Sequence, residues 1–239
     1  MILSAYTYSL LKEMITFVET LRRPMKRLVI FDLDGTLLDT IADLAAATNH
    51  ALQKNGFPMH DVETLRTFVG NGIGKLLERA LPEEGRTADN VERLRSDFVP
   101  YYDEHNADLS QPYPGVAELL SRLQQKGAML AVASNKYQAA TVKLVAHYFP
   151  NIHFVSVLGQ REGVPVKPHP GIVHDIMASA GVTADEVLYV GDSGVDMQTA
   201  CNAGVEAVAV SWGFRPRQEL EAASPLAVID RAEELLDYV

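Results

Sequence analysis

The chain has 239 residues, 47% hydrophobic and 22% charged, a composition that suits a globular protein and excludes collagen-like, fibrous and disordered classes. Its net charge of −10, without a Lys/Arg cluster, argues against nucleic acid as a partner, because such binding needs a basic surface. The single cysteine, Cys201, excludes an intramolecular disulfide, and the absence of a long apolar run argues against a membrane partner.

The first two dozen residues have apolar positions at roughly helical spacing, from Leu3 to Leu21. They lack the basic start and the small-residue cleavage site of a secretory signal. We therefore expect residues 1–24 to be an accessory helix or a translated upstream extension, with the main domain beginning at Met25.

From Lys26 onward, short apolar runs alternate with amphipathic ones. The runs rich in Val, Ile and Leu predict strands at Leu28–Phe31, Met129–Ala133, Phe154–Leu158, Val187–Val190, Ala207–Val210 and Ala227–Ile229. The amphipathic runs between them predict helices at Val116–Gln125, Gln138–His147, Pro170–Ala180 and Asp196–Ala203. Repeated β-α-β units predict an α/β fold with a doubly wound, Rossmann-like parallel sheet.

One stretch departs from this alternation. Helical patterns without a convincing strand occupy Ile41–Asn55, Asp61–Val69, Gly74–Ala80 and Thr87–Asn106. We therefore predict an all-helical cap domain at residues 40–110, inserted between the first and second strands of a catalytic core formed by residues 25–39 and 111–239. Two prolines and Gly115 mark the return to the core.

Ligands of open parallel sheets bind beyond the carboxyl ends of the strands, so the loops there carry the chemistry. The first strand leads into Asp32-Leu33-Asp34-Gly35-Thr36, where alternation places both carboxylates on one side of the backbone. Asp32 could attack a phosphoryl group, and Asp34 could act as its acid and base. Gly35 would allow close approach of the backbone to a substrate. The structural alternative is an Asp-Gly turn with Thr36 as a cap.

Three later loops suit the same task. Ser134-Asn135-Lys136 follows the second strand and could hold phosphate oxygens, or it could simply cap the next helix. Lys167 precedes a proline-initiated helix and could neutralise a phosphate and the nucleophile together, or could be a solvated lysine in a turn. Asp192 and Asp196, after the fourth strand, are oxygen ligands that suit Mg²⁺, or acids that favour a helix N-terminus.

The four loops, in this order and each after a predicted strand, resemble the motifs of the haloacid dehalogenase superfamily over nearly the whole chain after Met25. The resemblance implies that Asp32 is the nucleophile and Asp34 the acid and base, and that Ser134 and Lys167 bind phosphate. Dehalogenation is disfavoured, because the dehalogenating members lack the acid that stands here as Asp34. The resemblance therefore implies a phosphatase.

The same resemblance implies a Mg²⁺ cofactor. Its ligands would be the Asp32 carboxylate, the Asp34 backbone carbonyl and Asp192, with Asp196 in support. Further substrate-binding residues of these motifs would be Gly35, Thr36 and Asn135.

Within the superfamily, phosphoglycolate phosphatases are the most similar group. The stretches that carry this likeness are Asp39–Leu44, Val69–Gly72, Pro112–Gly115 and Val190–Ser193. In the cap, Gly70, Asn71 and Gly72 would bind the substrate's carboxylate, with Lys75 nearby, or would form a plain turn between helices. The expected substrate is a small phosphorylated metabolite, 2-phosphoglycolate, with pyrophosphate, nucleoside monophosphates and sugar phosphates left open.

Two other functions share parts of this motif pattern. β-Phosphoglucomutase-like phosphotransferases carry a histidine shortly after the first motif, where this chain has Ile41–Ala45 and no histidine before His50. A phospho-receiver-like signalling domain also phosphorylates an aspartate, but it has no cap and needs no acid such as Asp34. We expect a cytoplasmic enzyme that is a monomer or a homodimer.

Overall fold

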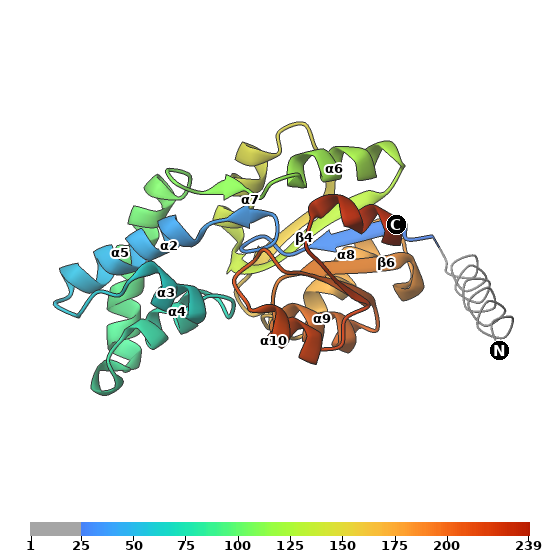
Figure 1. The fold of residues 1–239 in the computed structure, drawn as a ribbon. Helices are drawn as coiled ribbons and strands as arrows, with labels where there is room; N and C mark the ends of the chain where they lie inside the picture. Colours follow the sequence, from blue (N-terminus) through green and yellow to red (C-terminus); the bar gives the residue numbers. More distant parts are fainter. Residues whose placement is uncertain (1–24) are drawn as a thin grey trace, which may run out of the picture.

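The computed structural model describes residues 25–239, so the accessory helix predicted at residues 1–24 lies outside the described part. A parallel sheet forms its centre, with the strand order β5-β4-β1-β6-β7-β8 (Figure 1). The strands are β1 (Leu28–Phe31), β4 (Met129–Tyr137), β5 (Phe154–Gln160), β6 (Val187–Gly191), β7 (Glu206–Val210) and β8 (Ala227–Ile229). The doubly wound α/β fold predicted from the sequence is confirmed.

The central strand β1 shows why such apolar runs form this sheet. Val29 and Phe31 pack into the hydrophobic cluster on one face, and Leu28 and Ile30 into the cluster on the other, so both faces need apolar side chains. The first face is covered by α6 (Val116–Gln125), α7 (Gln138–Tyr148) and a C-terminal 3-10 helix (Ala232–Tyr238). The second is covered by α8 (Gly171–Ala180), α9 (Gly194–Ala203) and α10 (Arg217–Ala222).

The helical insert has a hydrophobic cluster of its own. Its helices are α2 (Ile41–Lys54), α3 (Val62–Phe68), α4 (Ile73–Ala80) and α5 (Ala88–His105), and they lie to one side of the sheet (Figure 1). Leu52, Leu77 and Phe98 are almost fully buried in this cluster. Within residues 25–239, no helix combines the length and the apolar character needed to cross a bilayer.

Two short strands link the insert to the sheet, and the sequence did not predict them. β2 (Leu38–Asp39) pairs antiparallel with β3 (Gln111–Pro112), where we had expected only a turn. Strands of two residues are too short to show an alternating pattern. Asp43, in the first turn of α2, accepts hydrogen bonds from the backbone N–H groups of Leu109 and Ser110. The entering and leaving chains are thus held together.

Candidate active site

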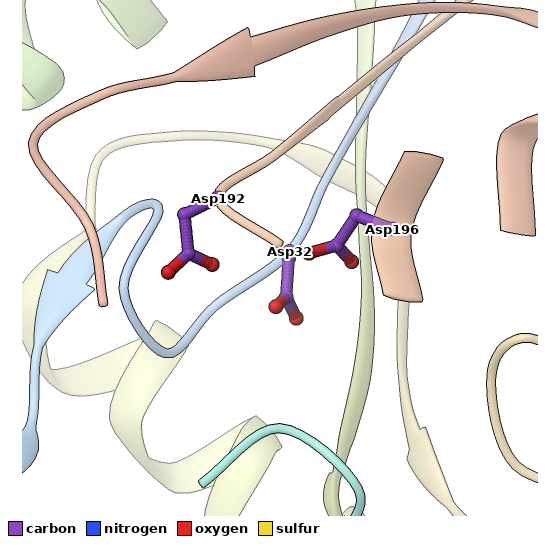
Figure 2. A group of neighbouring side chains, drawn as sticks. All are labelled: Asp32, Asp192 and Asp196. Atoms are coloured by element: carbon purple, nitrogen blue, oxygen red, sulfur yellow. The ribbon is translucent and has the colours of Figure 1, made fainter. Parts of the chain in front are cut away.

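Three carboxylates converge at the carboxyl ends of β1 and β6 (Figure 2). Asp32 directly follows β1, Asp192 follows β6, and Asp196 lies in the first turn of α9. Each offers an oxygen within 4.8 Å of the others. The grouping follows from the topology, because β1 and β6 are parallel neighbours and end at the same edge of the sheet.

Lys167 lies beneath Asp32 with its Nζ 2.9 Å from Asp32 Oδ1. The three hydrogen bonds of the ammonium group go elsewhere, to the Ala133 carbonyl (2.9 Å), the Tyr189 hydroxyl (3.0 Å) and Asp196 Oδ1 (2.7 Å). Asp32 Oδ1 is therefore buried beside a positive charge but accepts no hydrogen bond among the described residues. It is free to bind an electrophile or a cation.

Burial is the main cause that raises the pKa of Asp32 from 3.8 to about 7. Lys167 opposes this rise, whereas the negative charges of Asp196 and Asp34 add to it. Burial also raises the pKa of Asp192 well above its ordinary value, again with a contribution from its acidic neighbours. When Asp32, Asp192 and Asp196 are all ionised, their negative charge therefore exceeds the positive charge of Lys167.

The Asp192 carboxylate is fixed by its surroundings. It accepts hydrogen bonds from the Thr36 hydroxyl (3.3 Å) and from the Phe214 backbone N–H (2.7 Å). A Cβ atom on Gly213 would lie 2.3 Å from Asp192 Cβ, and one on Gly35 would lie 2.3 Å from Asp192 Oδ2, so both positions need glycine. Thr36 and Gly35 therefore support Asp192, and their predicted role in binding substrate stays a prediction.

Asp34 is held from two sides. Lys136 Nζ lies 2.9 Å from both carboxylate oxygens, and the Thr40 hydroxyl donates to one of them at 2.7 Å. The Lys136 ammonium also lies 4.8 Å from the centroid of the Tyr102 ring, on cap helix α5. Sequence reasoning gave Lys136 no role. Its position two residues after Ser134 could have indicated a role in the site, because alternation in β4 places both side chains on the same face.

Two neighbouring residues near the end of β4 have different roles. Ser134 lines the cleft, and its Oγ accepts from the Lys136 N–H at 3.2 Å, which leaves the hydroxyl proton for a ligand. The Asn135 side chain accepts from the Lys167 N–H (2.8 Å) and donates to the carbonyls of Lys167 (3.1 Å) and Gly70 (3.0 Å). The Asn135 side chain therefore joins the core to the cap, and the prediction that Asn135 binds substrate stays a prediction.

A cleft of about 50 Å³ separates the cap from these core residues. Gly70 and Gly72 line it, as predicted for the cap loop, but Asn71 does not, since its Oδ1 accepts from Arg79 at 2.8 Å. Lys75 also lies elsewhere, paired with Glu78 on the surface. The cation that lines the cleft beside this loop is Arg215, which was not predicted.

The residues present fit a divalent cation. Asp32 and Asp192 supply hard oxygen ligands, one of them without a hydrogen bond, in a site where added positive charge would relieve the burial of carboxylates. Both Asp196 oxygens already have donors: Oδ1 accepts from Lys167, and Oδ2 from the Ser193 hydroxyl at 2.6 Å. This pattern favours a supporting role for Asp196.

Comparison with known proteins shows to which family the chain belongs. A phosphoglycolate phosphatase from Mesorhizobium japonicum is 37% identical over 210 residues, covering 87% of this chain and 92% of that protein. One from Vibrio parahaemolyticus is 36% identical over 218 residues, covering 89% and 96%. The structure of a proposed phosphoglycolate phosphatase from Lactobacillus delbrueckii subsp. bulgaricus is similar with a TM-score of 0.85 at 34% identity, covering 90% and 98%. The family model for haloacid dehalogenase-like hydrolases matches residues 29–210, and the chain belongs to this family of enzymes.

Proposed function

We propose that this protein is a Mg²⁺-dependent phosphomonoester hydrolase that forms an aspartyl-phosphate on Asp32. The observation that carries the proposal is the buried Asp32 Oδ1, whose partner is the Lys167 ammonium group at 2.9 Å. A buried carboxylate held only by an ion pair at the end of a strand keeps room for an electrophile, and a fixed positive charge beside it suits a nucleophile.

The reaction then has two displacements. Asp32 attacks phosphorus, the bond from phosphorus to the leaving oxygen breaks, and Asp34 gives that oxygen a proton. Asp34 next takes a proton from water, whose oxygen attacks phosphorus and releases phosphate from Asp32. Ser134 holds a phosphoryl oxygen, Lys167 supplies positive charge beside Asp32 while keeping its three hydrogen bonds, and Lys136 orients Asp34.

Mg²⁺, when bound by Asp32, the Asp34 carbonyl and Asp192, supplies positive charge that offsets the charge of the phosphoryl group. In this site the family's divalent ion would be held by oxygen atoms alone. Asp196 contributes indirectly, because its carboxylate fixes the Lys167 ammonium at 2.7 Å.

We further propose 2-phosphoglycolate as the substrate. Both curated relatives described above carry that activity in their names. The cleft is small, with a volume of about 50 Å³, which favours a small substrate over a nucleotide. The backbone of the loop from Gly70 to Gly72 is available for the substrate's carboxylate.

The test of the chemistry is phosphate release from 2-phosphoglycolate with Mg²⁺. Asp32→Asn and excess EDTA should each abolish turnover, whereas Asp175→Asn, which changes an exposed aspartate paired with Arg161, should leave it unchanged. Wild-type protein should also become labelled with phosphate in a rapid acid quench, and Asp32→Asn should not. Turnover that survives Asp32→Asn would refute the mechanism.

The substrate assignment needs a separate measurement. A panel of kcat/KM values should include 2-phosphoglycolate, a sugar phosphate, pyrophosphate and a nucleoside monophosphate. We expect 2-phosphoglycolate to exceed each of the others by at least tenfold. A smaller preference would leave the hydrolase mechanism standing and remove the substrate.

A further inference from the structure

Arg215 is a core residue whose side chain extends to the cap and hydrogen-bonds the carbonyls at the end of helix α3. It lies in the loop after β7, and its Nη1 donates to the Arg66 carbonyl at 3.0 Å. Its Nη2 donates to the carbonyls of Thr67 (3.4 Å) and Val69. These three carbonyls belong to the end of α3, directly before the loop of residues 69–72 that lines the cleft.

The end of α3 is capped only in part from within the cap, where Arg79 Nη1 donates to the Phe68 carbonyl at 2.8 Å. The last carbonyls of a helix have no acceptor role within the helix and carry partial negative charge. α3 ends at Val69 in an extended conformation (φ −69°, ψ 156°), not in the left-handed turn that would cap these carbonyls from within the chain. A planar guanidinium group presents five donors in a fixed fork that can span several of these carbonyls, whereas an ammonium group is a compact charge with three donors on a flexible stem.

The loop between β7 and α10, which carries Arg215, also contacts the carboxylates of the site through Phe214. The Phe214 N–H donates to Asp192 Oδ2 at 2.7 Å, and the Phe214 ring packs in the cap's hydrophobic cluster, 5.6 Å from the Arg66 guanidinium. Two consecutive residues of the core therefore hold the cap, while the backbone between β7 and α10 holds a carboxylate of the site. The Arg215 side chain is 16% exposed, so most of it is buried at this junction.

We propose that Arg215 is a positioning residue that holds the cap closed by fixing the loop of residues 69–72 over the cleft. The proposal rests on the proposed function only in taking the closed cleft as the reactive form. Asn135 adds one hydrogen bond to Gly70, but Arg215 supplies the larger number of contacts and the only charge at the end of α3 that comes from the core among the described residues. Loss of Arg215 should free the loop without removing any group that touches the phosphoryl centre.

Hydrogen exchange measures this directly, without substrate. Arg215→Ala, Arg215→Lys and Arg217→Ala would be compared with the wild type in the same Mg²⁺ buffer. Arg217 is the matched control, because it lies two residues further on and its partners, exposed Glu221 and Asp230 and the Val228 carbonyl, all belong to the core. We expect at least tenfold faster exchange in a peptide covering residues 66–74 for Arg215→Ala, a smaller increase for Arg215→Lys, and no change for Arg217→Ala.

Exchange in α6, which lies on the core, should be unchanged in all variants and reports whether each one is folded. Unchanged exchange at residues 66–74 in Arg215→Ala would overturn the proposal, and so would an equal increase in Arg217→Ala. If Arg215→Ala does not fold, Arg215→Lys alone decides by the same criterion, because lysine lacks the rigid fork of donors that spans the carbonyls of Arg66 and Val69.

Kinetics separate this role from a merely structural one. For Arg215→Ala, kcat/KM for 2-phosphoglycolate should fall at least tenfold, whereas that for p-nitrophenyl phosphate, whose aryl group does not need a closed cap, should stay within about threefold. An equal fall for both substrates would contradict cap positioning. If the wild type shows no phosphatase activity at all, the proposed function fails, and the exchange data still decide the role of Arg215.

Discussion

Replacing Asp32, the proposed nucleophile, should make the metal-free protein more stable. Asp32 is buried, and its pKa is raised from 3.8 to about 7, mainly by burial. The folded state therefore keeps a proton that the unfolded chain has already lost, and ionising Asp32 in the fold costs free energy. Asp32→Asn removes this cost. It does not leave Lys167 unpaired, because Asp196 remains 2.7 Å from the ammonium group.

The size and pH dependence follow from the shift. A rise of about 3 pH units corresponds to about 4 kcal/mol at 1.36 kcal/mol per unit. Because the folded-state pKa of Asp32 is the higher one, the wild type loses this stability as pH rises from 3.8, and the loss is complete above pH 7. The stability gained by Asp32→Asn should thus be smallest at pH 4, should grow through pH 5 and 6, and should reach about 4 kcal/mol at pH 8.

Urea unfolding in EDTA at pH 5, 6, 7 and 8 measures this difference. Asp175→Asn serves as the control, and its side chain is 52% exposed, so it should stay within about 0.5 kcal/mol of the wild type at each pH. Adding Mg²⁺ should narrow the gap, because a cation that binds the folded wild type stabilises it. An Asp32→Asn variant that is equally stable as the wild type at pH 8, or a gap that does not grow with pH, would refute the reasoning.

Three further substitutions test the supports of the site. Lys136→Met removes the ion pair to Asp34 and should lower kcat by about 10- to 100-fold, within the range that acid-base catalysis contributes; an unchanged kcat would contradict the orienting role. Gly213→Ala places a Cβ 2.3 Å from Asp192 Cβ and should cost about 1–3 kcal/mol in thermal unfolding, together with weaker Mg²⁺ binding; a neutral result would show that the loop yields. Asp43→Asn replaces a carboxylate that accepts from the backbone N–H groups of Leu109 and Ser110 with a neutral amide, and should destabilise the protein by about 3 kcal/mol in urea unfolding; a change below 1 kcal/mol would mean that Asp43 does not hold the entering and leaving chains together.

The main elements were predictable because burial on both faces of the sheet leaves a strong local pattern. The helix at Val116–Gln125 and the strand at Ala227–Ile229 have the predicted bounds. β4 extends four residues beyond the predicted Ala133 and carries Ser134 and Lys136 within the strand. Those residues are polar because they face the site, so apolar content alone could not assign them to a strand.

Some residues of the candidate site could be predicted from the sequence, and others could not. Asp32, Asp192 and Asp196 come together because they follow neighbouring strands, which topology rules can anticipate. Arg215 could not be placed, since its partners are backbone carbonyls near Arg66, and carbonyls leave no trace in residue types. Tertiary hydrogen bonds of this kind are visible only once the fold is known.

The charges around the cleft explain how an acidic chain could act on an anionic substrate. Four carboxylates share this region with two lysines: Asp32, Asp34, Asp192 and Asp196 with Lys136 and Lys167. Both lysines are already paired, so a phosphate dianion would meet an excess of negative charge, at a cost of about 4 kcal/mol for each pair of like charges 4 Å apart at an effective dielectric of 20. A divalent cation cancels that excess. Because coupling between two ligands is reciprocal, the phosphate must in turn tighten the binding of the cation. The raised pKa values of Asp32 and Asp192 express the same deficit of positive charge in the protein alone.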